Sequence, residues 1–350
     1  MGYAGGGLMQ GMEDKMKAAL FQRGGTFEIA EVPVPVPGPG EAVVRVRYCG
    51  ICGSDLHLVE KGLLPPKAII GHELTGEVAA LGDGVQGWRE GEEVAVMPLA
   101  PCGTCEFCRA GNTQHCQNGL NSSYGLGMNP GGFAQFMRVK PSMLYRIPAG
   151  LDLKTAALTE PWAVGRHGVA MLGTGGPVLI MGAGPIGLMC IYALRERGVN
   201  NIFVSEPDPA RAERAKRAGA RVIDPAREKP LTVVIKEAGG PPQTVLDCAG
   251  TETSMMEAIN MVRPAGTVLM LGINMGKVSI LPIICFGKEI SIKFSFGYTA
   301  AEFSAALSAL AANALDPAVL ISAVIPLADL NLAFQSLHAP GQAKVLIDCL

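Results

Sequence analysis

A strand that runs into a glycine-rich turn and then into a helix constrains the fold of this chain more than any other feature. The apolar run PVLIMGA at 177–183 predicts the strand, GAGPIG at 182–187 forms the turn, and an apolar helix follows. Glycines in G-x-G-x-x-G spacing let backbone N–H groups approach a pyrophosphate at the positive end of the helix. The pattern alone is weak in a chain with 45 glycines, and its place between strand and helix makes it specific. The three glycines are Gly182, Gly184 and Gly187.

Strands and helices continue to alternate after this turn. Such alternation requires parallel pairing, and it predicts an α/β fold with an open, doubly wound parallel sheet of the Rossmann type. The expected strands cover 201–205, 220–224, 244–250 and 267–272, and the expected helices cover 185–197, 208–218, 231–238 and 252–262.

The second strand of this series ends at Glu206, nineteen residues beyond Gly187. A carboxylate at this place accepts hydrogen bonds from the hydroxyls of an adenosine ribose and repels a 2′-phosphate, so the sequence favours NAD over NADP. Arg211 lies nearby, either to stack on adenine or to reach a phosphate.

Residues 16–160 have a different texture. Short alternating or apolar runs are separated by Gly/Pro turns such as PGPGE at 37–41, a spacing typical of a compact, barrel-like β domain. From about residue 301 one more helix and two strand-like runs follow, and we expect them to return to the first domain, because a final strand needs a partner sheet. The runs in the first part begin with MKAALFQ at Met16 and continue at 42–50, 76–81, 92–99 and 133–139.

Four cysteines in C-x2-C-x2-C-x7-C spacing occupy a polar, turn-rich stretch at 102–116. Four thiolates so close together can close a tetrahedral shell around one Zn²⁺, which leaves no position for chemistry. An iron–sulfur cluster is the alternative occupant. We expect a structural zinc held by Cys102, Cys105, Cys108 and Cys116.

A second set of possible ligands is spread along the chain. Cys52 lies in CGICGSDLH, and His72 and Glu73 lie in GHE. A thiolate, an imidazole and a carboxylate leave one zinc position open for water or substrate oxygen, as catalysis requires. Each of these residues taken singly is more often a packed residue than a ligand.

Composition excludes several other classes. A net charge of −2 gives no electrostatic footprint for nucleic acid, and no run of about 18 apolar residues indicates a membrane span. Residues 1–15 lack the pattern of a secretory signal and are expected to be a flexible leader, which favours a cytoplasmic location. Cysteines in that compartment indicate metal ligation or core packing before disulfides.

These motifs together resemble the zinc-dependent medium-chain alcohol dehydrogenase superfamily, over essentially all of 16–350. GHELTGEVAALGDGV at 71–85 is similar to its zinc signature, and CGICGSDLH, the four-cysteine lobe, GGFAQF and GAGPIG follow its order. The E-P pair at 160–161 is typical of the polyol, threonine and butanediol dehydrogenase branch. The resemblance implies a GroES-like zinc-binding catalytic domain at 16–162 and 301–350, and a Rossmann NAD-binding domain at 163–300.

The resemblance also implies roles for residues around the catalytic zinc. Cys52 and His72 match the zinc ligands, and Glu73 and Glu160 match carboxylates that hold the ion directly or through water, in an order the sequence leaves open. Asp55 matches the carboxylate that orients the histidine ligand. Ser54 and His57 match a relay that carries the substrate proton towards solvent.

For the cofactor, the resemblance adds residues of the glycine-rich turn and of two later segments near the nicotinamide. It also implies a homodimer or homotetramer. The cofactor residues that it implies are Gly182, Gly184, Pro185, Ile186, Gly187, Glu206 and Arg211, with Leu271, Gly272, Ile273, Phe296 and Gly297 on the nicotinamide side.

Three residues depart from the pattern of the branch. Trp162 stands where Leu is usual, either narrowing the substrate pocket or packing at the head of a helix. Arg166 either recognises an acidic group or lies on the surface, and His167 has no matching catalytic role, so we interpret it as structural.

The sequence therefore predicts an enzyme with one catalytic and one structural Zn²⁺ per chain. It would transfer a hydride between NAD and a secondary alcohol or polyol, or the matching ketone. The alternative is a catalytically silent nucleotide-binding protein of the same fold, although the residues whose loss would mark it are all present.

Overall fold

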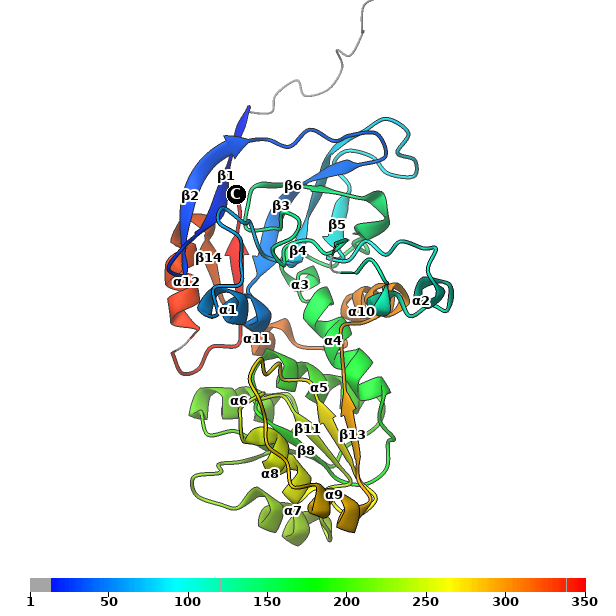
Figure 1. Cartoon of the computed structure of the whole chain (residues 1–350), viewed down its shortest axis with the longest axis vertical. Coiled ribbons are helices and arrows are strands. Elements are labelled where there is room, and N and C mark those ends of the chain that lie inside the picture. The colour runs from blue at the N-terminus through cyan, green and yellow to red at the C-terminus, as the bar shows by residue number, and fades with distance from the viewer. Residues whose placement is uncertain (1–13, 120, 338) are drawn as a thin grey trace, which may run out of the picture. The chain divides into compact units, whose positions relative to one another are not determined.

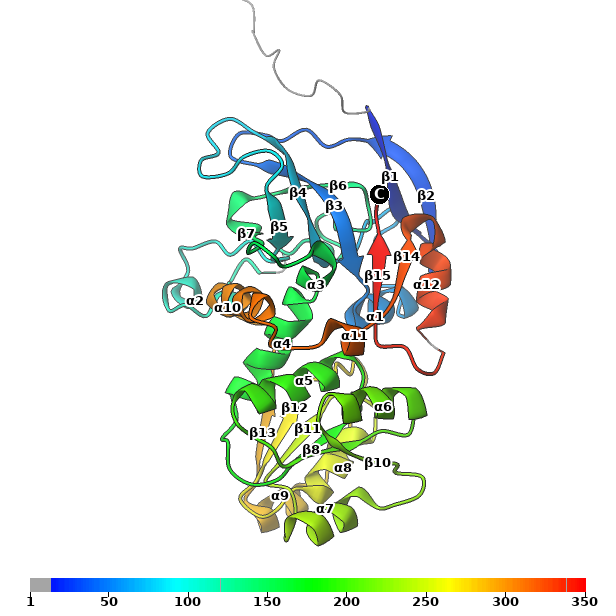
Figure 2. The same cartoon turned by 180° about the vertical axis from the view of Figure 1, so that it is seen from behind.

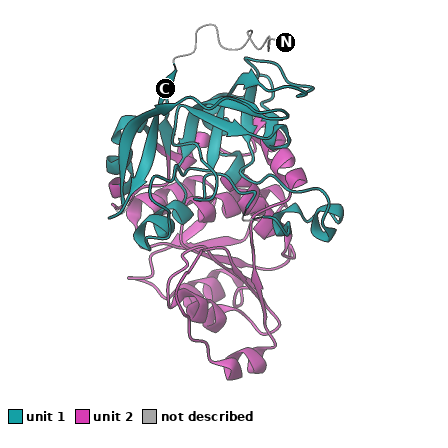
Figure 3. Ribbon diagram, turned by 45° about the horizontal axis from the view of Figure 1, so that its top comes forward, with its two compact units in different colours: residues 1–160, 324–334, 346–350 teal, residues 161–323, 335–345 magenta. Residues whose placement is uncertain are grey.

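The computed structural model describes residues 14–119, 121–337 and 339–350. Most of the expected leader lies outside the described residues, and the first strand begins at Lys15. The chain divides into two compact units, coloured separately in Figure 3. Unit 1 comprises Met1–Glu160, Val324–Phe334 and Leu346–Leu350, and unit 2 comprises Pro161–Ala323 and Gln335–Val345.

The units differ from the expected domains after residue 301, because 301–323 and 335–345 group with unit 2. Side chains of unit 2 explain this: the guanidinium of Arg214 donates to the carbonyl of Val319 at 2.7 Å, and that of Arg211 donates to the carbonyl of Gln342 at 3.0 Å.

Unit 2 contains a six-stranded sheet in the order β10-β9-β8-β11-β12-β13, with every neighbouring pair parallel. β8, the first strand of this sheet in the sequence, thus lies in the middle of it. The next two strands, β9 and β10, extend the sheet on one side, and β11 to β13 extend it on the other, as in a dinucleotide-binding fold. The strands are β8 (Val178–Met181), β9 (Ile202–Ser205), β10 (Arg221–Ile223), β11 (Thr244–Asp247), β12 (Thr267–Met270) and β13 (Ser291–Phe294).

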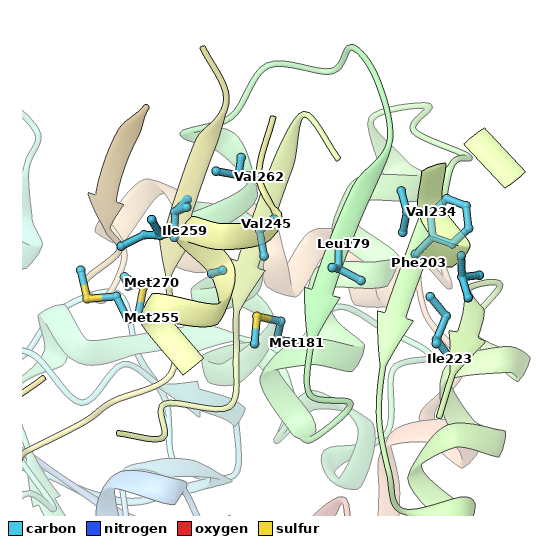
Figure 4. Close-up of a cluster of buried hydrophobic side chains, with 13 residues drawn as sticks. Leu179, Met181, Phe203, Ile223, Val234, Val245, Met255, Ile259, Val262 and Met270 are labelled. Atoms are coloured by element: carbon cyan, nitrogen blue, oxygen red, sulfur yellow. The ribbon is translucent and has the colours of Figure 1, made fainter. Parts of the chain in front are cut away.

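Helices of unit 2 bury the faces of this sheet. Figure 4 shows one core, in which Leu179, Phe203 and Val245 from the strands pack with Val234 and Ile259 from helices. The inner strands β8, β9, β11 and β12 are almost entirely buried, because both faces of the sheet are covered there. The helices are α5 (Pro185–Glu196), α6 (Pro209–Arg217), α7 (Pro230–Ala238), α8 (Ser254–Met261), α9 (Pro282–Lys288), α10 (Ala300–Ala311) and α11 (Pro317–Leu320); α4 (Thr159–Ala170) begins at the end of unit 1 and continues into unit 2.

Unit 1 is β-rich, as the alternating runs predicted (Figure 1). A seven-stranded sheet has the order β14-β15-β3-β4-β5-β7, with β6 also paired to β3, and β1 and β2 form a separate hairpin. Its strands are β1 (Lys15–Gln22), β2 (Thr26–Pro33), β3 (Ala42–Gly50), β4 (Glu73–Leu81), β5 (Glu93–Val96), β6 (Phe136–Val139), β7 (Leu144–Arg146), β14 (Ile321–Pro326) and β15 (Lys344–Asp348). Its helices are α1 (Gly53–Glu60), α2 (Glu106–Arg109), α3 (Leu153–Ala156) and α12 (Leu330–Ser336).

The end of the chain supplies a strand to this sheet. β15 pairs antiparallel with β3, and Ile347 lies opposite Cys49 (Figure 2). The expectation that the final strand needs a partner sheet near the start of the chain is confirmed. Among the described residues, no helix combines the length and apolar character needed to span a bilayer.

Candidate functional site

The dispersed set of predicted ligands comes together at the ends of two neighbouring strands. β3 and β4 are antiparallel, and Gly50 lies opposite Glu73, so the residues just beyond β3 and just before β4 are neighbours. One ligand atom each from Cys52, His72 and Glu73 lies within 4.8 Å of the others. His72 and Glu73 are buried and Cys52 is half-buried.

Asp55 lies behind this cluster and is completely buried. One carboxylate oxygen accepts the N–H of Cys52 at 2.9 Å, and the other lies 3.3 Å from Nδ1 of His72. This contact directs the second ring nitrogen, Nε2, away from Asp55. Burial alone lowers the pKa of His72, but the Asp55 carboxylate and then Cys52 outweigh it and raise that pKa well above its ordinary value.

The donor set fits a catalytic zinc ion. Thiolate, imidazole and carboxylate are the side chains that Zn²⁺ prefers, and three of them leave a position open. A carboxylate that fixes the ring of a histidine ligand is a recurrent feature of such sites. Glu160, at the first turn of α4, is buried, but it does not belong to the group of mutually close ligand atoms.

The residues predicted to relay a proton lie on α1, which begins directly after Cys52. Ser54 and His57 are three positions apart and therefore share one side of the helix. Oγ of Ser54 is 3.5 Å from Nε2 of His72, and both relay side chains are half-buried. Ser54 is thus next to the ligand cluster.

The four-cysteine segment forms a separate cluster on the surface of unit 1. Its sulfur atoms also lie within 4.8 Å of one another, and all four thiols are free. Backbone N–H groups point at the sulfurs: that of Cys105 is 3.4 Å from Cys102, that of Cys108 is 3.5 Å from Cys105, and that of Cys102 is 3.4 Å from Cys116. Such contacts favour thiolates, and four thiolates fit a closed zinc shell.

The pKa values of the clustered thiols differ: that of Cys102 is lowered, whereas burial raises that of Cys108 to about 12. The hydroxyl of Thr104, 3.6 Å away, and then the N–H groups of Thr104 and Cys105 lower the pKa of Cys102 to about 5. A thiol of that pKa is ionised at neutral pH, as metal ligation requires.

The glycine-rich turn joins β8 to α5 with the geometry that its glycines predict. Gly182 has φ 92°, in the left-handed region that favours glycine. A Cβ at Gly187 would lie 2.1 Å from the carbonyl oxygen of Gly182, so no other residue fits there without a shift. Gly184 caps the N-terminus of α5, and Pro185 and Ile186 form its first turn.

Glu206 is buried at the end of β9 and holds this turn. One of its oxygens accepts the N–H of Ala183 at 2.7 Å, and the other accepts the N–H of Asp208 at 2.8 Å. Glu206 therefore connects the turn to the start of α6. Arg211, on α6, donates from Nε to the carbonyl of Gln342.

The remaining residues predicted on the cofactor lie where other strands of the same sheet end. Leu271, Gly272 and Ile273 follow β12, and Phe296 and Gly297 follow β13. The carboxyl ends of parallel strands share one edge of the sheet, so these segments and the glycine-rich turn line the same edge.

Two of the three residues that depart from the branch pattern, Trp162 and Arg166, lie together on α4. The guanidinium of Arg166 is paired with Glu196: Nε and Nη2 each lie 3.0 Å from one of its carboxylate oxygens, and the guanidinium lies 5.7 Å from the ring centre of Trp162. Its charge is therefore neutralised between α4 and α5. Trp162 is completely buried.

Comparisons with known proteins agree with this geometry. Residues 38–149 match the family model of the alcohol dehydrogenase GroES-like domain, and residues 185–312 match that of the zinc-binding dehydrogenases. The chain is 33% identical over 347 residues to a 2-dehydro-3-deoxy-L-galactonate 5-dehydrogenase of Pseudoalteromonas atlantica, covering 95% of this chain and 99% of the relative. It is 34% identical over 269 residues to the sorbitol dehydrogenase of Bacillus subtilis, covering 74% and 75%.

A solved alcohol dehydrogenase of Escherichia coli CFT073 in complex with NADH has the same fold. It superposes with a TM-score of 0.87 at 29% identity, covering 96% of this chain and 100% of the other. The fold, both metal-type clusters and these relatives lead to one conclusion: the chain belongs to the zinc-binding medium-chain alcohol dehydrogenase family and is an oxidoreductase of CH–OH groups.

Proposed function

We propose that the chain is a zinc-dependent, NAD-linked dehydrogenase of polyols and related hydroxylated sugars. The observation that carries the proposal is the cluster of Cys52, His72 and Glu73, with Asp55 fixing the histidine ring. The relatives named for sorbitol and for a sugar acid support this class of substrate.

Cys52, His72 and Glu73 would hold the catalytic zinc, with Glu160 available as a further ligand or as a base for a bound water. When bound, the ion supplies a Lewis acid that favours the deprotonated form of the alcohol near neutral pH. Asp55 keeps the proton of His72 on Nδ1, so that Nε2 is free to ligate. Cys102, Cys105, Cys108 and Cys116 would hold a second, structural zinc.

Ser54 and His57 would move the proton of the substrate hydroxyl. Oγ of Ser54 is 3.5 Å from Nε2 of His72, and His57 lies one turn further along α1 and is half-buried. A histidine suits this step, since its pKa is ordinarily near neutrality.

Unit 2 would bind the cofactor. The N–H groups at the start of α5 are suited to the pyrophosphate, and Glu206 retains a free lone pair on each oxygen for the ribose hydroxyls. Its negative charge favours NAD over NADP. Leu271, Gly272, Ile273, Phe296 and Gly297 would line the nicotinamide side, and Arg211 the adenosine end.

We also propose that the protein is a homo-oligomer, a dimer or a tetramer. β13 is paired on one side only, and apolar side chains are exposed around it: Ile283 is 73% exposed, Phe286 77% and Phe294 67%. An edge strand beside exposed apolar side chains pairs readily with another chain. A second copy of the same strand is the partner that fits it by symmetry.

The test is turnover by the zinc-loaded protein. NAD⁺ is mixed with sorbitol, xylitol, butane-2,3-diol and an aldonate, and NADH is followed by absorbance while zinc is counted by mass spectrometry. We expect about two zinc ions per chain and turnover of at least one polyol or sugar acid. Cys285 is a half-buried cysteine of α9 outside both clusters, so Cys285→Ser serves as the matched control for a substitution of Cys52. Absence of NADH formation with every alcohol, at full zinc content, would refute the proposal.

A further inference from the structure

The second half of α4 is fixed within unit 2 by long cationic side chains. The guanidinium of Arg197 donates to the carbonyls of Val169 and Leu172, the latter at 3.0 Å, and Nζ of Lys293 donates to the carbonyl of Met171 at 2.9 Å. These contacts tie the end of α4 to the end of α5 and to β13. This part of α4 is therefore a rigid support.

His167 projects from this support onto Glu302 in the first turn of α10. Its Nδ1 lies 2.9 and 3.0 Å from the two carboxylate oxygens, and both side chains are largely buried, at 16% and 31% exposure. A carboxylate only accepts hydrogen bonds, so the proton of the ring is on Nδ1. No local pattern predicts this pair, because the two residues are 135 positions apart.

Glu302 at the same time closes the start of α10. Its Oε2, the oxygen 2.9 Å from Nδ1 of His167, also accepts the N–H of Thr299 at 2.7 Å, while Oγ1 of Thr299 accepts the N–H of Glu302 at 3.1 Å. This reciprocal capping box fixes Thr299. His167 thus holds Thr299 through Glu302.

Thr299 ends a short segment, 295–299, whose other end is also fixed. The N–H of Ser295 donates to the carbonyl of Met270 at 3.0 Å. Between these two points lie Phe296, 67% exposed, and Gly297, whose φ is 58°. The segment therefore presents Phe296 outward from two anchored ends.

The residue next to His167 touches both segments assigned to the nicotinamide. A Cβ at Gly168 would lie 2.5 Å from Cδ2 of Leu271 and 3.2 Å from Oγ of Ser295, so the glycine lets the α4 backbone approach them closely. His167 and Gly168 together bring one turn of α4 against the segments that follow β12 and β13.

The pKa of Glu302 agrees with a tight contact. Partial burial raises this pKa, but the hydrogen bond of His167 and the N–H of Thr299 outweigh it, so the net pKa is below its ordinary value. Glu302 is therefore ionised throughout the neutral range.

We propose that His167 is a positioning residue for the nicotinamide ring: by binding Glu302 it fixes the segment 295–299, which would line the nicotinamide site. This inference rests on the proposed function, which assigns Phe296 and Gly297 to the nicotinamide side. His167 does not touch the reacting atoms. Its effect is to keep the nicotinamide ring at the distance and angle that hydride transfer needs. Small displacements of that ring lower the rate of the transfer strongly.

Three variants separate positioning from simple stabilisation. His167→Ala removes the donor, and His167→Asn retains an amide N–H close to the place of Nδ1. Glu237→Gln is the matched control, because it breaks another ion pair of unit 2, with Arg221, whose two side chains are 46% and 37% exposed. The measurements are kcat, the KM of NAD⁺, the dissociation constant of NADH, and the deuterium isotope effect on kcat with substrate labelled at the oxidised carbon.

We expect His167→Ala to lower kcat about ten-fold and to raise the isotope effect, because hydride transfer becomes slower than product release. The dissociation constant of NADH should rise about three-fold or less, since the adenosine and pyrophosphate contacts are intact. His167→Asn should restore most of the lost kcat, and Glu237→Gln should match the wild type.

Two results would overturn the inference while the proposed function stands. One is that the wild type is active and that the kcat and isotope effect of His167→Ala are within two-fold of the wild-type values. The other is an equal loss in the Ala and Asn variants, with a lower melting temperature and an unchanged isotope effect, which indicates a structural role alone. A zinc-loaded wild type that neither binds NADH nor turns over would overturn both proposals together.

Discussion

The two metal-type clusters of unit 1 are built in opposite ways. The four cysteines lie within fifteen residues, and backbone turns between them aim N–H groups at the sulfurs, with three of the four thiols on exposed or half-buried residues. Cys52, His72 and Glu73 are brought together by the pairing of β3 with β4, and Asp55 is completely buried behind them. A local loop defines the first cluster, whereas the sheet defines the second.

This difference predicts different consequences of losing each site. A site made by the sheet can lose its ion while the sheet persists, so the loss appears in chemistry. The loop around the four cysteines has little hydrophobic core of its own, so it is expected to unfold locally when the ion leaves.

The largest effect is expected from Cys52→Ser. We expect kcat/KM to fall by about 10³-fold or more, because the ion that activates the alcohol is lost or misplaced. The zinc content should fall by about one ion per chain. Assay and metal analysis of the purified variant, beside Cys285→Ser, test this; a variant that keeps its zinc and activity would show that Cys52 is not a ligand.

Cys105→Ser should affect stability before chemistry. The closed shell would lose a ligand, and we expect the melting temperature to fall by several degrees, on the order of a 2–4 kcal/mol loss. Freshly purified variant at low temperature should still bind NADH through unit 2. Calorimetry and NADH titration are the measurements, and an unchanged melting temperature with one zinc lost would contradict the structural role.

Asp55→Asn tests whether the negative charge of the buried carboxylate beside His72 is needed. The amide is nearly the same size but cannot stabilise the Nδ1 proton of His72 as a carboxylate does, so we expect activity or zinc affinity to fall about 10- to 100-fold. Zinc competition with a chelator, together with kcat/KM, measures it. If the variant behaves as the wild type, the 3.3 Å contact with His72 has no functional role.

Thr104→Val should have the smallest effect, on the exposed cluster. The hydroxyl is the first cause that lowers the pKa of Cys102 to about 5, so its loss raises that pKa. Protons compete with zinc for the sulfur, and they compete better when the pKa of the thiol is higher, so the variant should release zinc at a higher pH than the wild type. Activity at pH 7 should stay within about two-fold. A chromogenic zinc indicator across pH 4–7 follows the release.

The same contrast explains what the sequence could predict. The four cysteines, the glycine-rich turn and α5 are defined by residues close together in the chain, and the structure has them where their spacing indicated. Cys52 and His72 could be paired only through the resemblance to a family, because no local pattern brings β3 beside β4.

Other features of the fold cannot be predicted from local sequence patterns. β13 lies in KEISIKF, where charged and apolar residues alternate, unlike the apolar runs that form most of the sheet, so the sequence does not predict it as the sixth strand. The ion pair of Arg166 cannot be predicted either, because its partner Glu196 is on another helix. His167 and Glu302 meet only after the chain has passed through the whole Rossmann sheet.

The pairing of the last strand with β3 has a consequence for synthesis on the ribosome. Arg47 and Asp348, which form an ion pair across this ladder, are 301 positions apart. At about 5–20 residues per second, β3 waits on the order of 15–60 s for β15 to be made. During that time the part of β3 that pairs with β15, Tyr48–Gly50, has an open edge, so the strand that leads to Cys52 reaches its final pairing only after β15 has been made. Deleting β15, Lys344–Asp348, should therefore yield chains that depend on chaperones to fold, even though every proposed ligand is present.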